Sequence, residues 1–512
     1  MAGGLRKPHE ALESVESYSP AEELFNRRRR TAGLFLGPLV FIALLLLPMP
    51  GLSPAAHRLA AILALMVVLW ITEALPLAVT ALAGPVLAVL MGVAPARAVF
   101  APFADPIIFL FIGSFILAEA MFVHGLDRRI AFTALSLKAV GRTPGRILIA
   151  YGTVTAVISM WISNTATTAM MFPLGLAVVG HLAAGREREP AVRRYAMAMM
   201  LVTAFAASIG GLGTPVGTPP NLIGIALLRQ QAGIDISFDR WMLVGLPIVV
   251  LVLAGLFAIF HVFAVRGMTI AQGSADLVRE ELRKLGPVTR GQRNVMLAFF
   301  TTVLLWLLPG VFAITGYGDS DAARRYAALV PESIAAMAGA ILLFLLPVHW
   351  PARRFTLTWE EAARIDWGIV LLFGGGLTMG ALADSTGLAG SMGRALAGSM
   401  DQPSPLLLTA LFTGVAIVIS EAASNTASAT IIVPIAIAVS NAAGVSPLEP
   451  ALGATFGASM GFMMPISTPP NAVVYSSGHV PITQMMRYGV MLDILGYFVI
   501  LAIVMTIGRF AI

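Results

Sequence analysis

Long apolar stretches alternate with short polar segments along most of the chain. Eleven of these stretches have a length close to that of a membrane span, and they cover residues 33–50, 57–74, 77–95, 106–124, 195–228, 241–264, 294–314, 328–347, 367–383, 451–478 and 489–508. A helix that crosses the hydrocarbon core of a bilayer needs about 20 mainly apolar residues. The pattern therefore predicts an all-α polytopic membrane protein with about 11 transmembrane helices.

Two further apolar regions, residues 146–182 and 405–442, have a different pattern. Each consists of two arms of about 15 residues on either side of a polar Ser-Asn-Thr centre. Arms of this length are short for a full span and suit a re-entrant helical hairpin, which enters and leaves the membrane on the same side. Two ordinary short spans remain open as an alternative, and either interpretation returns the chain to its starting side.

The composition supports a membrane protein and excludes other classes. Of the 512 residues, 58% are hydrophobic and only 12% are charged, which is about half of the charged share in soluble globular proteins. So little charge cannot cover the surface of a soluble enzyme of this length, and the high hydrophobicity excludes a disordered chain. Pro and Gly interrupt the long apolar runs, unlike the alternating strands of a membrane β-barrel.

The distribution of basic residues predicts the orientation in the cell (inner) membrane. With the N-terminus inside, alternating the eleven spans puts most of the 33 Lys and Arg residues on the cytoplasmic side, including the run from Arg27 to Arg30. By the positive-inside rule, the N-terminus is cytoplasmic and the C-terminus lies outside. The same rule explains the net charge of +6 without nucleic acid as a partner. The chain has no Cys, so disulfides and thiolate metal sites are excluded.

Three sequence motifs occur twice in the same order. Residues 111–126 read FIGSFILAEAMFVHGL and residues 373–388 read FGGGLTMGALADSTGL; Ser-Asn-Thr at 163–165 recurs at 424–426; and Thr-Pro-Pro-Asn at 218–221 recurs at 468–471. The offsets of 262, 261 and 250 residues are nearly equal, which indicates a duplicated unit. Because the copies enter the membrane from opposite sides in the predicted topology, we expect the inverted repeat of many secondary transporters.

The repeat defines the predicted organisation of the chain. We expect a cytoplasmic N-terminal tail at 1–32, a first transmembrane helix at 33–54, repeat 1 at 55–270 with the hairpin 146–182, a cytoplasmic amphipathic linker at 271–293, and repeat 2 at 294–512 with the hairpin 405–442. The linker mixes acidic and basic residues at helical spacing, which is typical of an interfacial helix. The lipid bilayer thus surrounds both repeats.

The repeated polar motifs are the candidate binding site. Unpaired backbone groups cost several kcal/mol in hydrocarbon, so broken helices occur there only where they line a cavity or bind a ligand. At each Ser-Asn-Thr centre, the carbonyl groups that end one arm suit a hard cation such as Na⁺. The free N–H groups that begin the next arm suit an anion. None of the four motifs contains Lys or Arg, so anion binding should depend on a co-bound cation.

Neighbouring positions add possible ligands to these motifs. Ser159 and Ser420 lie four residues before the serine of each Ser-Asn-Thr centre, on the same helical face. Proline removes a backbone donor and unwinds a helix, which frees the carbonyl groups of Gly217 and Ser467. Glu421 adjoins the second centre, where both a proton-coupling and a structural role remain open.

With paired Ser-Asn-Thr hairpins and paired Thr-Pro-Pro-Asn segments, the chain resembles the divalent anion:sodium symporter family over about residues 55–510. The resemblance implies a homodimer with scaffold and transport domains that moves its substrate by an elevator motion. It implies Na⁺ ligands at Ser159, Ser163, Asn164, Gly217, Ser420, Ser424, Asn425 and Ser467. It implies substrate contacts at Asn164, Thr165, Thr218, Asn425, Thr426, Thr468 and Pro469.

These features together predict a secondary active transporter. We expect Na⁺-coupled symport of C4 dicarboxylates such as succinate, malate or fumarate, with Na⁺ as the coupling ion and no organic cofactor. A dicarboxylate exchanger without net Na⁺ coupling, and a citrate or sulfate transporter of the same fold, remain open. The sequence offers no enzyme motif, since it lacks HExxH, a GxSxG with a plausible His partner, and Cys. It also lacks a Walker A loop, so an ATP-driven pump is not expected.

Overall fold

The computed structural model describes residues 20–136, 143–183, 189–265, 274–398, 400 and 403–509. Most of the predicted N-terminal tail, the first three residues of the predicted linker and the last three residues of the chain lie outside this part. Helices dominate the described residues, and the only strands among them are the short antiparallel pair β1 (Pro347–His349) and β2 (Arg354–Phe355). The fold class is therefore all-α, as predicted.

The helices fall into two runs along the chain. The first run contains α2 (Pro20–Leu46), α3 (Pro54–Thr72), α4 (Leu77–Leu90), α5 (Ala96–Phe100), η1 (Ala101–Ala104), α6 (Pro106–Val123), α7 (Leu126–Leu135), α8 (Pro144–Ser159), α9 (Asn164–Ala183), α10 (Pro190–Gly211), α11 (Pro219–Ala232), α12 (Phe238–Phe260) and η3 (His261–Val265). The second contains α13 (Ser274–Lys284), α14 (Arg290–Ile314), α15 (Asp321–Leu329), α16 (Glu332–Leu345), α17 (Trp359–Ala362), α18 (Trp367–Ser385), α19 (Leu388–Ala397), α20 (Pro405–Ala422), α21 (Asn425–Ala442), α22 (Leu448–Gly457), α23 (Pro469–Tyr475), α24 (Ile482–Ile503) and η4 (Val504–Gly508).

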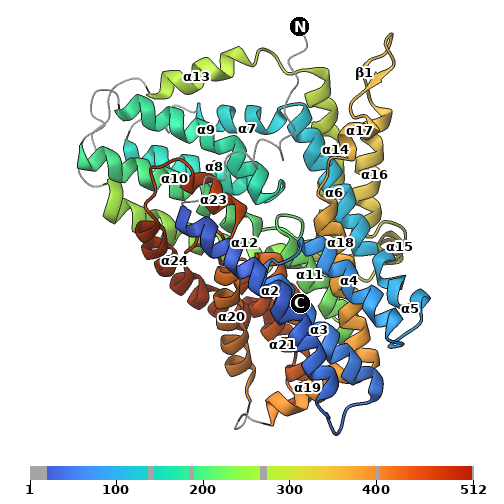
Figure 1. Ribbon diagram of the computed structural model, residues 1–512. Coiled ribbons are helices and arrows are strands. Elements are labelled where there is room, and N and C mark those ends of the chain that lie inside the picture. Colours follow the sequence, from blue (N-terminus) through green and yellow to red (C-terminus); the bar gives the residue numbers. More distant parts are fainter. Residues whose placement is uncertain are drawn as a thin grey trace.

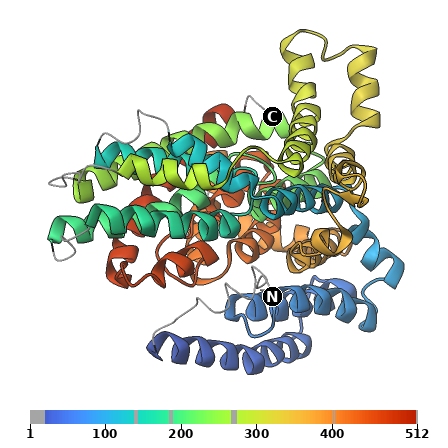
Figure 2. The same ribbon diagram turned by 90° about the horizontal axis from the view of Figure 1, so that it is seen from above.

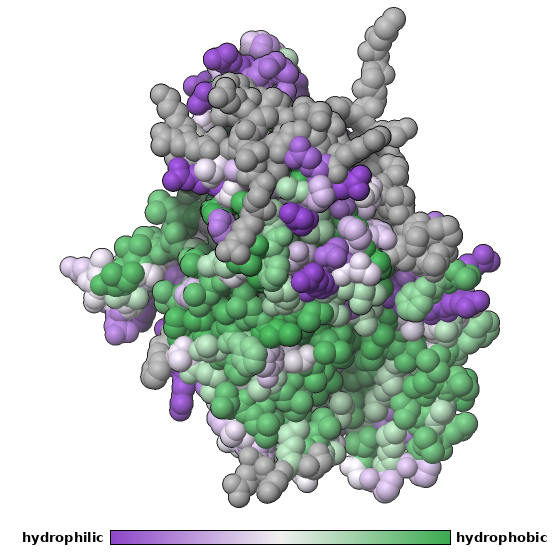
Figure 3. All heavy atoms as spheres, turned by 90° about the vertical axis from the view of Figure 1, so that its left-hand side faces the viewer, coloured by the Kyte–Doolittle hydropathy of each residue, from purple (hydrophilic) through white to green (hydrophobic). Residues whose placement is uncertain are grey.

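Many of these helices can cross a membrane. Within the described residues, ten are long and apolar enough, or up to eleven if the bent pair α15 and α16 forms one span. A broad hydrophobic region covers much of one face, and hydrophilic residues gather toward one end (Figure 3). On α20 and α24, large apolar side chains such as Val418 and Phe498 are more than 60% exposed. Such a surface is stable in lipid and not in water, so this is an integral membrane protein.

The helix boundaries differ from the predicted ones in two ways. Helix α2 begins at Pro20, so the arginine run 27–30 lies within a helix and not in a tail before it. The predicted spans 195–228 and 451–478 are each divided into two helices, α10 with α11 and α22 with α23. Both divisions end at a Pro-Pro pair, where the missing N–H groups and the fixed φ start a new helix. Helices α20 and α21, which are the arms of the second predicted hairpin, are each long and apolar enough to count among the ten possible spans.

Helices from the two halves of the chain are packed against each other in a crossed arrangement. Helix α6 contacts α16, and α18 contacts α4, so each half contributes one helix to each pair (Figures 1 and 2). A Cβ atom on Gly113 would lie 2.6 Å from the backbone carbon of Ala336, and one on Gly375 would lie 2.2 Å from the carbonyl oxygen of Ala81. The two glycines occupy matching positions in the repeated motif. Only glycine allows backbones to approach this closely.

The aromatic residues of the same motif meet at the centre of this arrangement. Phe111 and Phe373, which match in the two copies, contact each other with ring centroids 5.0 Å apart and an edge-to-face angle of 70°. This contact joins the two segments that carry the first repeated motif.

We expect Gly375→Val to destabilise the protein by about 1–3 kcal/mol, because the new side chain must push α18 away from α4. The change should appear as a lower unfolding temperature of the purified protein in detergent. Gly180→Val is the control, since Gly180 also lies within a helix and a Cβ atom there would meet no other atom within 4 Å. Equal unfolding temperatures for the two variants would contradict the close approach of α18 and α4.

Candidate functional site

Each Ser-Asn-Thr centre lies at a break between two helices. Helix α8 ends at Ser159 and α9 begins at Asn164, while α20 ends at Ala422 and α21 begins at Asn425. The serine of each centre caps the second helix: Ser163 accepts a hydrogen bond from the N–H of Ala166 at 3.3 Å, and Ser424 accepts one from Ala427 at 3.2 Å. The remaining N–H groups of each first turn stay available for a ligand.

A serine–asparagine hydrogen bond crosses each break. The hydroxyl of Ser159 donates to Oδ1 of Asn164, and the hydroxyl of Ser420 donates to Oδ1 of Asn425, both at 2.8 Å. Ser159 and Ser420 are fully buried, whereas the two asparagines are half-buried. The structure thus brings together the two residues that the sequence placed five positions apart, and it fixes the asparagine amide at the edge of each break.

Two further breaks precede α11 and α23. The Thr-Pro-Pro-Asn segments begin these two helices. Thr218 and Thr468 precede α11 and α23 and have extended backbones, with φ of −148° and −145°. Thr468 caps α23 by accepting from the N–H of Asn471 at 3.3 Å. Both threonines are buried, and Pro469 is exposed.

The asparagine of each Thr-Pro-Pro-Asn segment holds the unwound chain in place. The amide of Asn221 donates to the carbonyl groups of Gly211 and Thr214, both at 2.8 Å. The amide of Asn471 donates to the matching carbonyl groups of Gly461 and Met464, both at 3.0 Å. Each amide therefore replaces helical hydrogen bonds that the break has removed.

The amide oxygens of these two asparagines have no donor. Both Asn221 and Asn471 are fully buried, and Oδ1 of each has no hydrogen-bond partner among the described residues. The orientation of each amide is fixed, because its NH₂ group donates to two carbonyl groups. A buried, unpaired amide oxygen is costly, and it is the type of ligand that a hard cation prefers. These oxygens are a feature that the sequence prediction of the site did not include.

Glycines bring the two kinds of motif together. A Cβ atom on Gly211 would lie 2.5 Å from Oδ1 of Asn164, and one on Gly217 would lie 2.5 Å from the carbonyl oxygen of Gly211. In the second half, a Cβ atom on Gly461 would lie 3.1 Å from Oδ1 of Asn425. Each tip asparagine therefore rests against the end of a broken helix, which brings Asn164 close to Gly211 and Asn425 close to Gly461.

Crossed contacts join the two clusters. Helix α9, which starts at the first Ser-Asn-Thr centre, contacts α23, which starts at the second Thr-Pro-Pro-Asn segment. Likewise α21 contacts α11. Each of these contacts joins a helix that starts at a Ser-Asn-Thr centre to a helix that starts at a Thr-Pro-Pro-Asn segment of the other half.

The two clusters differ at the position that precedes Thr-Pro-Pro-Asn. Where the first half has Gly217, the second has Ser467, whose hydroxyl donates to the carboxylate of Glu421 at 2.8 Å and to the carbonyl group of Glu421 at 3.0 Å. The same carboxylate accepts hydrogen bonds from the N–H groups of Phe462 at 2.7 Å and Met463 at 2.9 Å. Glu421 thus stabilises the break in the second half.

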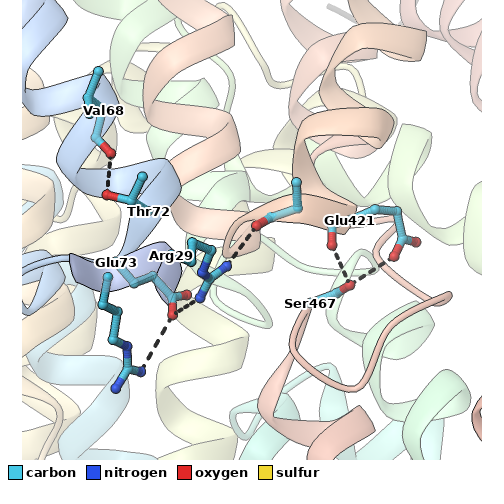
Figure 4. Close-up of polar contacts among 8 residues, drawn as sticks. Arg29, Val68, Thr72, Glu73, Glu421 and Ser467 are labelled. Carbon is cyan, nitrogen blue, oxygen red and sulfur yellow. Dashed lines mark hydrogen bonds and ion pairs between the residues drawn. The ribbon is translucent and has the colours of Figure 1, made fainter. Parts of the chain in front are cut away.

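An arginine from outside the motifs also reaches the second hairpin. The guanidinium of Arg29 donates to the carbonyl group of Ala422 at 3.1 Å and to the carboxylate of Glu73 at 2.6 Å (Figure 4). Glu73 follows α3 and has a left-handed backbone, with φ of 50°. The contact ties α2 and α3 to the end of α20, where the helix dipole favours a cation. Sequence reasoning missed it, since it assigned the arginine run only to membrane orientation.

The fold and the site define a class of protein. A membrane-embedded helical fold with helices that are broken at polar, oxygen-rich motifs is typical of a secondary transporter. Residues 28–511 match the family model described as the sodium:sulfate symporter transmembrane region. The chain therefore belongs to this family, which confirms the predicted resemblance to divalent anion:sodium symporters.

Relatives with assigned functions agree with this membership. The sodium-dependent dicarboxylate transporter SdcS of Staphylococcus saprophyticus is 34% identical over 478 residues, covering 92% of this chain and 90% of the relative. The SdcS of Staphylococcus aureus strain USA300 is 33% identical over the same shares. The protein is thus a transporter and not an enzyme.

A solved structure shares the fold at low sequence similarity. The YdaH transporter of Alcanivorax borkumensis aligns with a TM-score of 0.54 at 16% identity, over 80% of this chain and 86% of that one. At this identity the likeness concerns the helical architecture alone.

We expect Arg29→Gln to lower the unfolding free energy by about 1.5–3 kcal/mol, because a partly buried hydrogen bond to a charged group contributes this much. The side chain of Arg29 is 13% exposed. Arg30→Gln is the matched control, since Arg30 lies 3.7 Å from the same Glu73 carboxylate with 59% of its side chain exposed. Thermal unfolding of both purified variants measures the difference. Equal stability would show that Arg29 does not hold the hairpin.

Proposed function

We propose that this protein is a Na⁺-coupled symporter of C4 dicarboxylates such as succinate, malate or fumarate, located in the cell (inner) membrane. The main support is the pair of matching oxygen-rich clusters, each with a tip asparagine, a capping serine and a buried, unpaired asparagine oxygen. Two relatives that cover most of the chain are named sodium-dependent dicarboxylate transporters. A cation site on each side of one binding region explains how a dianion can be held without Lys or Arg in the motifs.

The residues take distinct roles in this proposal. Na⁺ binds at the ends of the first arms, through oxygens of Ser159, Ser163, Asn164 and Gly217 in one half and of Ser420, Ser424, Asn425 and Ser467 in the other. The substrate carboxylates bind between the clusters, where N–H groups, amides and hydroxyls converge, at Asn164, Thr165, Thr218, Asn425, Thr426, Thr468 and Pro469. Bound Na⁺ supplies the positive charge that attracts the dianion, so substrate and ion bind together.

Alternating access follows from the repeat in this proposal. The hairpins α8–α9 and α20–α21 are re-entrant and enter from opposite sides, as expected for an inverted repeat with a cytoplasmic N-terminus and an external C-terminus. The hairpins and broken helices form a transport domain that moves as an elevator against a scaffold domain, in a homodimer. The reciprocal close approaches of Gly113 and Gly375 support such a pseudosymmetric arrangement.

Other substrates and coupling modes suit the same fold. The family description names sulfate, which is also a divalent anion that neutral donors can bind. Citrate transport and dicarboxylate exchange without net Na⁺ coupling are the further alternatives. Cavity size and ion coupling decide among them, and both are measurable.

Uptake of radiolabelled succinate into proteoliposomes tests the proposal. The vesicles are either empty or preloaded with dicarboxylate, and an inward Na⁺ gradient is compared with choline. We expect concentrative uptake into empty vesicles that requires Na⁺ and is inhibited by malate and fumarate but not by citrate or sulfate. Uptake that needs internal dicarboxylate and ignores Na⁺ would identify an exchanger instead.

We expect Asn164→Ala and Asn425→Ala each to reduce Na⁺-dependent uptake to background, because each removes an amide that faces both the cation and the substrate region. The hydrogen bond from Ser159 or Ser420 would also lose its acceptor. Asn441→Ala is a matched control at the exposed far end of α21, and it should retain wild-type uptake. Near-normal uptake by both tip variants, at equal amounts of folded protein, would place the site elsewhere.

A further inference from the structure

The tips of the two hairpins carry different residues at one matching position. Residues 158–161 of the first hairpin read ISMW and align with residues 419–422 of the second, which read ISEA, at the offset of 261 residues found for the Ser-Asn-Thr centres. Trp161 therefore matches Ala422. Trp161 is half-buried and Ala422 is exposed. At both tips, this position contacts helices from outside the hairpin.

The first tip contacts its neighbours through aromatic rings. The ring of Trp161 meets the ring of Phe299, on α14, edge-to-face, with the centroids 5.2 Å apart at 85°. It also stacks on Phe238, the first residue of α12, with the centroids 6.2 Å apart. Phe238 in turn stacks on Trp306 of α14 with the centroids 4.5 Å apart. The contact of Trp161 with Phe299 is called the first tip contact.

The second tip is contacted by a guanidinium group. Arg29 donates to the carbonyl group of Ala422 while it pairs with the carboxylate of Glu73 (Figure 4). Gly33, one turn after Arg29, brings α2 close to α3, because a Cβ atom on Gly33 would lie 2.0 Å from the hydroxyl oxygen of Thr72. Helix α2 and the end of α3 thus present Arg29 to the tip together. The contact of Arg29 with Ala422 is called the second tip contact.

The helices that hold the two tips are connected to each other by direct contacts. Helix α2 contacts α3, α3 contacts α4, α4 contacts α18, α18 contacts α6, α6 contacts α16, and α16 contacts α14. None of these seven helices carries a Ser-Asn-Thr centre or a Thr-Pro-Pro-Asn segment. In the proposed elevator motion they belong to the scaffold domain, whereas the hairpins belong to the transport domain. Each tip contact therefore crosses the boundary between a fixed part and a moving part.

From this geometry we propose that Trp161 and Arg29 are positioning residues, which hold the two hairpin tips against the scaffold in the observed conformation and release them in each transport cycle. The inference rests on the proposed function, since the elevator motion is what separates the two parts. The contacts use different chemistry at matching positions: one is aromatic, and the other is a hydrogen bond from a charged group. A merely structural tie would stay closed during transport.

Reversible cross-linking tests the proposal, and the chain has no Cys of its own that would react. Arg29→Cys with Ala422→Cys places two thiols across the second tip contact, and Trp161→Cys with Phe299→Cys places two across the first. Each pair is joined by a bifunctional methanethiosulfonate whose reach matches the side chains that were removed. Succinate uptake into proteoliposomes, empty or preloaded with dicarboxylate, is measured before cross-linking, after it, and after reduction. We expect uptake by both pairs to fall to background on cross-linking and to return on reduction.

Two controls separate the tether from other effects. Arg58→Cys with Met91→Cys reproduces the second tip contact within the scaffold, because the guanidinium of Arg58 donates to the carbonyl group of Met91 at 2.6 Å. Cross-linking this pair should leave uptake unchanged. Ala422→Cys alone, carrying a monofunctional methanethiosulfonate, should also keep its uptake, since Ala422 is exposed. A loss seen only with the bifunctional reagent across a tip contact therefore results from the tether.

The outcomes separate the possible failures. If either cross-linked pair takes up succinate as fast as before cross-linking, that contact stays closed during transport and the proposal is wrong, while the proposed symport stands. If wild-type protein takes up no succinate in either kind of vesicle, the proposed function fails before any cross-link is made, and the role of the tip contacts fails with it. If Arg29→Cys does not fold, Glu73→Cys with Ala422→Cys spans the same boundary and keeps Arg29. It should show the same reversible loss.

Discussion

Unwound backbone inside a membrane must find its hydrogen bonds within the protein, and this constraint shapes the whole structure. The chain is broken four times at polar motifs, and each break would leave several carbonyl and N–H groups without partners. The amides of Asn221 and Asn471 replace some of these bonds, and capping residues such as Ser424 replace others. Groups that stay unpaired, such as Oδ1 of Asn221 and Oδ1 of Asn471, lie at these breaks.

The two halves satisfy this constraint by similar but unequal means. In the first half, glycines let the tip asparagine rest directly on the end of α10. In the second half, Ser467 and the carboxylate of Glu421 add a charged centre to the same arrangement. The two breaks therefore have similar hydrogen-bonding scaffolds and unequal charge.

Glycine allows the broken helices to pack close to their neighbours. Gly113 and Gly375 bring helices from opposite halves into contact, and Gly489 does the same for α24 and the unwound segment before α23. Close backbone contact gains van der Waals energy in a lipid environment, where the hydrophobic effect does not hold helices together. The helices around the breaks are therefore tightly packed.

The sequence alone determined the protein class and named the candidate site residues, because membrane spans, polar breaks and repeated motifs are local patterns with a direct physical meaning. It placed Ser159 with Asn164 and Ser420 with Asn425, and these pairs meet through hydrogen bonds. The helix boundaries agree less well with the sequence prediction, because Pro-Pro pairs divide two of the predicted spans. Tertiary structure alone decided contacts between distant segments: Arg29 reaches Ala422 across 393 positions, and the Glu421 carboxylate accepts a hydrogen bond from the N–H of Phe462 across 41 positions. No local pattern encodes such pairs, because they depend on which helix faces are packed together.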